Sequence, residues 1–121
     1  MPLAIDTQVS RLTLGEPETL EVVTVPGEAV TNLGLDMHSI ADAAHVVPLG
    51  MTHDTLGYLL TGEEFGSVDG ETYEETVSMG PDTGERYLAA LETLFGNESR
   101  TVERTGPLRR TCSAVQVTLR D

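Results

Sequence analysis

The sequence predicts an α/β fold in which two helices pack on one mixed β-sheet. Two observations lead to this prediction. Several short runs are rich in β-branched and aliphatic residues, and two longer segments carry apolar residues at every third or fourth position. With 121 residues, the chain is long enough for one domain with a modest core but not for two. Aromatic residues make up only 4% of the chain, so the core must rest on Leu, Val, Ala and Met.

Strand-like runs occur along most of the chain. Leu20 to Val25 is dense in β-branched residues, as in a strand buried on both faces, and Thr7 to Leu14 alternates weakly before it. The turn signal Gly15-Glu16-Pro17-Glu18 between the two runs predicts a hairpin. Three further strands are expected: a buried one at Val46 to Met51, a short one at Glu74 to Met79 and a final one at Ala114 to Leu119.

The two helical segments differ in how they begin. In the first, from Glu28 to about Ala44, the apolar residues form one stripe, and Glu28 would lie in the first turn, where the helix dipole favours a carboxylate. The second begins at Pro81, because Pro suits the first helical turn, and Gly96 ends it. The expected order is therefore β-β-α-β-loop-β-α-β.

Charge is the strongest compositional signal. Twenty Asp and Glu oppose seven Arg, there is no Lys, and the net charge is -13. Such a charge repels nucleic-acid backbones and anionic membranes, and no apolar run approaches the roughly 20 residues of a membrane span. Adaptation to high salt explains the charge, because screening makes dense surface carboxylates tolerable. An acidic surface for one cationic partner is the alternative.

The charge is uneven, which suggests two regions. Residues 1–98 hold two Arg against eighteen acids, and residues 99–121 hold five Arg against two acids. We therefore expect an acidic body over residues 1–97 and a basic C-terminal tail over residues 98–121, with a possible final strand in the tail.

Glu28 and Tyr73 are candidate metal ligands. Glu28 follows Pro26-Gly27 at an expected strand-to-helix corner, where Gly27 would let a ligand approach the backbone closely. Tyr73 lies where a Gly- and Asp-rich loop meets an expected strand, a usual place for a site residue. Each has a structural alternative: a carboxylate at a helix N-terminus for Glu28, and a half-buried, hydrogen-bonded phenol for Tyr73.

The histidines do not predict a self-contained zinc site. His38, His45 and His53 are the only three, and neither an HExxH motif nor a paired Cys/His spacing is present. His53 is the most suggestive, because Asp54 beside it could orient its ring, and His53, Asp54 and Glu28 together form a weaker metal-site hypothesis. No GxSxG, P-loop or GxGxxG motif is present, so nothing nominates a nucleophile.

Three segments in order resemble the C-terminal portion of the catalytic domain of the neutral/alkaline (non-lysosomal) ceramidase family: TVPGE (24–28), HDTLGYLLTGEEF (53–65) and GETYEETVSMGPDTGE (70–85). The resemblance covers roughly residues 7–95. It implies a zinc-dependent amidase that cleaves the N-acyl bond of ceramide into sphingosine and fatty acid. Glu28 matches the family's glutamate zinc ligand, and Tyr73 matches its tyrosine ligand.

The departures from the family pattern limit what this chain would do alone. His53 and Thr55 stand where the family tends to have Asn and Tyr. The family's two zinc-binding histidines and its serine region precede the Pro-Gly-Glu by more sequence than this chain has. We therefore expect zinc to bind only if another chain or segment, the N-terminal half of such a domain, completes the site. If the completed site is active, we expect its substrate to be a lipid.

Alone, the chain should be weakly active or inactive, because catalytic zinc usually has three protein ligands. A non-catalytic, salt-adapted binding or structural domain is the alternative function. The N-terminus lacks the basic start and long apolar segment of a signal peptide, which makes a cytoplasmic location the default expectation.

Overall fold

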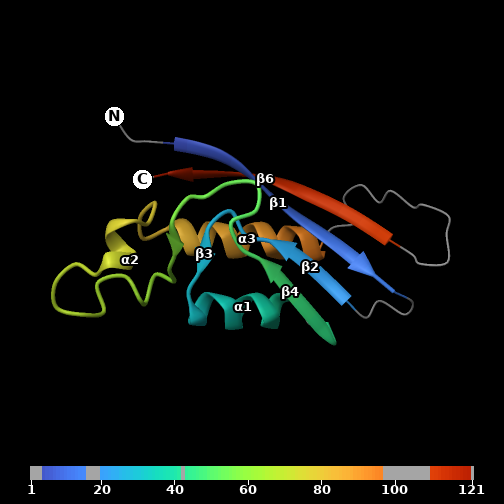
Figure 1. Cartoon of the computed structure of the whole chain (residues 1–121), viewed down its shortest axis with the longest axis horizontal. Coiled ribbons are helices and arrows are strands. Elements are labelled where there is room, and N and C mark those ends of the chain that lie inside the picture. Colours follow the sequence, from blue (N-terminus) through green and yellow to red (C-terminus); the bar gives the residue numbers. More distant parts are fainter. Residues whose placement is uncertain (1–3, 16–19, 42, 97–109, 121) are drawn as a thin grey trace.

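The computed structural model describes residues 4–15, 20–41, 43–96 and 110–120, and the side chains of the last stretch only from 114 to 119. The chain is a mixed α/β structure with a mixed sheet and helices packed on it, as the sequence predicts (Figure 1). Its elements in order are β1 (Ala4–Leu14), β2 (Leu20–Thr24), β3 (Glu28–Ala29), α1 (Thr31–Ala41), β4 (His45–Leu49), β5 (Tyr58–Leu59), α2 (Tyr73–Thr76), α3 (Thr83–Gly96) and β6 (Arg110–Arg120).

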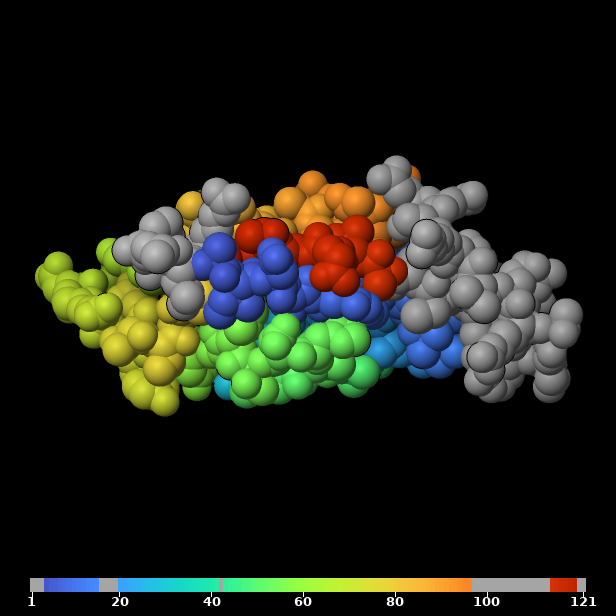
Figure 2. Space-filling model, turned by 90° about the horizontal axis from the view of Figure 1, so that it is seen from above, coloured from blue at the N-terminus to red at the C-terminus, as the bar shows by residue number. Residues whose placement is uncertain are grey.

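The main sheet has the strand order β4-β2-β1-β6. β1 is the central long strand and pairs antiparallel with both β2 and β6, whereas β2 and β4 are parallel. The antiparallel β1–β2 pair is the predicted hairpin. The parallel β2–β4 pair needs a crossover, which α1 supplies, because parallel neighbours cannot be joined by a tight turn. Figure 2 shows β1 and β6 side by side at the surface of the molecule.

One face of this sheet is buried by the helices. α3 packs against β1 and β6, and α1 packs against β4 and α3. Alternate strand residues and the helical stripes form a single core; its largest fully buried members include Val9, Val23, Leu33, Met37, Tyr87, Leu91, Leu94 and Leu119. The Tyr87 hydroxyl lies in this core and donates a hydrogen bond to the Thr24 carbonyl oxygen at 3.1 Å.

The first helix begins later than predicted, because residues before it pair with a distant strand. The Glu28 N–H donates to the Gly57 carbonyl oxygen at 2.9 Å, and the Val30 N–H donates to that of Leu59 at 3.2 Å. These bonds hold Glu28 in the short parallel pair β3–β5, and α1 starts only at Thr31. Glu28 therefore does not lie in the first turn of a helix.

Two predicted strands also differ from the structure. The segment after Thr72 is the helix α2, not a strand over Glu74 to Met79. β4 is an edge strand but not a buried one, since Val47 and Leu49 are 41% and 43% exposed.

The proposed boundary near residue 97 lies at a stretch outside the described residues, 97–109. Beyond it, β6 pairs with β1 over eleven residues, so residues 110–120 belong to the same sheet as the acidic body. In the part of the chain that the structure describes, no helix is long and apolar enough to cross a membrane.

Candidate functional site

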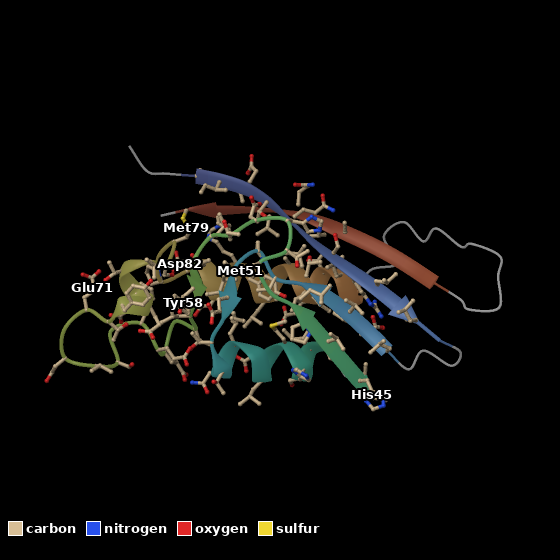
Figure 3. All side chains as sticks on the ribbon, in the orientation of Figure 1. His45, Met51, Tyr58, Glu71, Met79 and Asp82 are labelled. Carbon is tan, nitrogen blue, oxygen red and sulfur yellow. The ribbon has the colours of Figure 1, made fainter. Side chains whose placement is uncertain are left out.

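The two predicted metal ligands, Glu28 and Tyr73, lie beside one residue, Tyr58. Glu28 on β3 is the register partner of Tyr58 on β5, so their side chains leave the same side of the two-stranded ribbon. The rings of Tyr58 and Tyr73 meet edge to face, with centroids 6.0 Å apart and planes at 74°. Figure 3 labels Tyr58 on the side of the molecule that carries α2. Glu28 and Tyr73, 45 positions apart in the sequence, thus both lie next to Tyr58.

Two glycines allow the backbones around Tyr58 to approach closely. Gly57 has a φ of +81°, and a Cβ at this position would lie 1.7 Å from the Val77 carbonyl oxygen, just after α2. A Cβ on Gly27 would lie 2.4 Å from the Gly57 carbonyl oxygen. Gly27 therefore makes room for the neighbouring strand.

Tyr73 is positioned by a capping box at the start of α2. The Glu75 N–H donates to the Thr72 hydroxyl oxygen at 3.3 Å, and the Thr72 N–H donates to the Glu75 carboxylate at 2.8 Å. Glu75 also accepts a hydrogen bond from the Gly66 N–H, and these bonds, that of Gly66 first, lower the pKa of its carboxyl below the ordinary value. Glu75 therefore fixes the loop before Tyr73 and is not available to a ligand.

The site is open and negatively charged. Glu28 is exposed, and Tyr73 is 68% exposed. The negative charge of the Glu28 carboxylate is the main cause that raises the pKa of Tyr58. Partial desolvation and the nearby Tyr73 and Glu74 raise this pKa further. Tyr58 is therefore a neutral phenol beside the Glu28 carboxylate, and the negatively charged surroundings favour a cation.

The described residues alone do not supply a catalytic zinc site. Glu28 and Tyr73 offer two oxygen donors, whereas catalytic zinc usually has three protein ligands. Within the described ranges, no group of three or more His, Cys, Asp or Glu residues is placed to hold a metal ion. Any zinc at Glu28 and Tyr73 would need further ligands from elsewhere.

The histidines occupy other positions. The His53 Nε2 and the Ser10 Oγ are 3.0 Å apart and hydrogen-bonded, and the Thr7 hydroxyl donates to the Asp54 carboxylate. Both bonds attach the loop after β4 to β1, whereas Glu28 lies beside Tyr58 in the β3–β5 pair. The structure therefore does not join His53, Asp54 and Glu28 in one metal group.

The two other histidines lie elsewhere on the surface. His38 Nδ1 is 2.8 Å from the Gly34 carbonyl oxygen one turn earlier in α1. His45 is exposed at the start of β4. Both therefore lie on elements other than β3, β5 and α2, which carry Glu28, Tyr58 and Tyr73.

Tyr58 is the site residue that sequence reasoning missed. It lies in an apolar run, Leu56 to Leu60, which by itself indicates only a strand. The one local signal is the preceding Gly57, since a glycine within a strand pattern often marks a close approach of another backbone.

Comparisons with models of known protein families, with curated proteins and with solved structures found no match to this chain. The geometry around Tyr58 therefore carries the functional argument.

Proposed function

We propose that this chain contributes Glu28 and Tyr73 to the zinc site of a ceramidase-like amidase, and that histidines from another segment or chain complete the site. The supporting observation is that both residues lie against Tyr58, although one is on β3 and the other on α2. In the family that the sequence resembles, bound zinc would polarise the amide carbonyl and activate a water.

The residues of this chain would supply two zinc ligands and hold them in place. Tyr58 is the register partner of Glu28, which would supply one ligand oxygen, and the Tyr58 ring supports the Tyr73 ring, which would carry the other. Both donors are exposed, so further ligands and a substrate amide can reach them from solvent. Because the described residues supply only two ligand oxygens at this place, we expect the chain's own affinity for zinc to be weak and its own turnover to be negligible.

Calorimetric zinc titration tests this proposal. Wild type should show weak, saturable binding, and Glu28→Gln should weaken it measurably. Glu92→Gln is the matched control, because it removes one exposed carboxylate of α3 with the same change in charge. Equal binding by wild type and Glu28→Gln would contradict the proposal.

A fluorescent ceramide analogue tests the claim that the site is incomplete. The pure chain with added zinc should give no turnover above a zinc-only control. Turnover that is lost in Glu28→Gln would show that the chain is complete by itself, and would refute this part of the proposal.

The non-catalytic alternative has a specific form. Two tyrosine rings nearly at right angles, next to the Glu28 carboxylate, are the elements of a site for a small organic ammonium ion. If this is the function, tetramethylammonium should shift the NMR signals of Tyr58 and Tyr73 saturably, without zinc and in the presence of a chelator, whereas sodium should not. This function would be favoured over the amidase if two results are found together. Tyr73→Ala should lose the NMR shifts caused by tetramethylammonium, and wild type should not bind zinc.

A further inference from the structure

We infer that Ser10 and His53 form a second chemical site, in which the Ser10 hydroxyl is a nucleophile and the His53 ring is its base. The Ser10 Oγ and the His53 Nε2 are 3.0 Å apart, although the two residues are 43 positions apart in the sequence. At this distance an imidazole can take the proton of a hydroxyl group as that group attacks a reagent. The hydrogen bond is exposed to solvent, so a reagent can reach it. The inference does not depend on zinc, because it uses neither Glu28 nor Tyr73.

The neighbours of Ser10 leave its hydroxyl hydrogen to His53. The Gln8 side-chain amide donates to the Ser10 Oγ at 3.1 Å, and its own oxygen accepts a hydrogen bond from the Gln116 Nε2 at 3.3 Å. The Ser10 N–H donates to the Thr24 hydroxyl oxygen at 2.8 Å, which fixes the backbone. The Ser10 Oγ therefore accepts from Gln8 and donates to the His53 Nε2, with the imidazole hydrogen on Nδ1. This is the tautomer that a general base requires.

His53 is held in position by the loop after β4. Its φ of +74° lies in the left-handed region, which a residue other than glycine keeps only where the surrounding contacts impose it. Those contacts are present on both sides of it. The Thr52 N–H donates to the Val25 carbonyl oxygen at 3.0 Å, and the Asp54 carboxylate accepts a hydrogen bond from the Thr7 hydroxyl. Figure 2 shows the green region that contains this loop beside the blue region of β1 at the surface of the molecule.

The reaction that this pair supports is acyl transfer from an activated ester to Ser10. The Ser10 Oγ attacks the carbonyl carbon while its proton moves to the His53 Nε2. The bond from that carbon to the leaving oxygen then breaks, and the leaving oxygen takes the proton from His53. The product is an acyl-serine and a free alcohol, and nothing is oxidised or reduced. Because the chain has a net charge of -13, uncharged or cationic esters are the expected substrates.

A neutral fluorophosphonate probe tests the inference on the full chain, because a nucleophilic serine displaces its fluoride and keeps the phosphonyl group. Peptide mass spectrometry should find the label on Ser10, and Ser10→Ala should lose it. His53→Asn should slow the labelling of Ser10 about 100-fold or more, which is the range that a general base supplies. Asn tolerates a positive φ better than most residues, so this variant should keep the loop, which circular dichroism and urea unfolding check.

Ser67 is the matched control within the same chain. It is also an exposed serine, but its hydroxyl donates to the Glu64 carbonyl oxygen at 2.7 Å, and a carbonyl oxygen is too weak a base to take the proton. Ser10 should therefore react about 100-fold faster than Ser67, and Ser67→Ala should leave the rate at Ser10 unchanged. Equal rates at Ser10 and Ser67 in wild type, or no label on Ser10, would overturn the inference. Equal labelling of Ser10 in wild type and in folded His53→Asn would also overturn it, since His53 would then not act as a base.

Discussion

Replacing Gly57 with Ala tests whether close backbone packing assembles the site. At a φ of +81°, an L side chain costs about 1–2 kcal/mol. The added Cβ would also lie 1.7 Å from the Val77 carbonyl oxygen, and relieving such an overlap by shifting backbone costs a further 1–3 kcal/mol or so. We expect Gly57→Ala to lower the free energy of unfolding by about 2–5 kcal/mol.

Gly66→Ala separates the two contributions. Gly66 has a similar φ of +70°, but nothing lies within 4 Å of the place that an added Cβ would take, so only the conformational cost of about 1–2 kcal/mol applies. Urea unfolding of both variants in high salt measures the difference. NMR should also show that the contact between the Tyr58 and Tyr73 rings is lost only in Gly57→Ala. Equal destabilisation by the two substitutions would refute the packing argument.

Three other predictions concern stability. Arg11→Ala should lower the free energy of unfolding in urea by about 3–5 kcal/mol, because it leaves the buried Glu21 carboxylate without its cation. Glu21 is 3% exposed and accepts hydrogen bonds from Arg11 at 2.7 and 2.9 Å. A loss below about 1 kcal/mol would refute this prediction. Because the pKa of Glu75 is lowered in the folded chain, its carboxylate adds stability that is fully present at pH values above the ordinary pKa of 4.5. This stability is lost as the pH falls below 4.5, so the unfolding free energy of Glu75→Gln should depend less on pH in that acidic range. Because the net charge is -13, the melting temperature should rise steeply with salt concentration. A melting temperature that does not change with salt would refute the salt-adaptation hypothesis.

The sequence was sufficient for the elements whose signals are local. The alternation in β1 and β6 and the stripes of α1 and α3 follow from the spacing of apolar residues, and the structure contains all four. The sequence also predicts the mixed sheet with helices packed on it, because this is the most economical arrangement of the expected elements.

The errors arose where partners distant in sequence, or a competing local signal, decided the structure. Glu28 was placed in a helix because its stripe continues into α1, but its N–H bonds to Gly57, a partner that periodicity does not reveal. The helix α2 did have a local signal: Thr72 and Glu75 have the spacing of a capping box, which marks a helix start. This motif conflicts with the strand that the sequence analysis expects over Glu74 to Met79.

The site also combines residues that have a local signal in the sequence with one that depends on distant partners. Glu28 and Tyr73 can be nominated from the sequence, by their places at the ends of expected elements and by the resemblance of short motifs. Tyr58, which lies beside both, can be found only from the pairing of β3 with β5 and the approach of α2. Likewise, no sequence motif joins Ser10 to His53, and only the structure shows that they are hydrogen-bonded.

A double-mutant cycle of zinc affinity is the most direct test of the central claim, that Glu28 and Tyr73 face one cation. Zinc binding would be followed by NMR in wild type, Glu28→Gln, Tyr73→Phe and the double variant. If both oxygens bind the same ion, the two losses should be strongly non-additive, with a coupling above about 1 kcal/mol. Additive effects, or zinc-induced shifts that avoid β3 and α2, would contradict the claim.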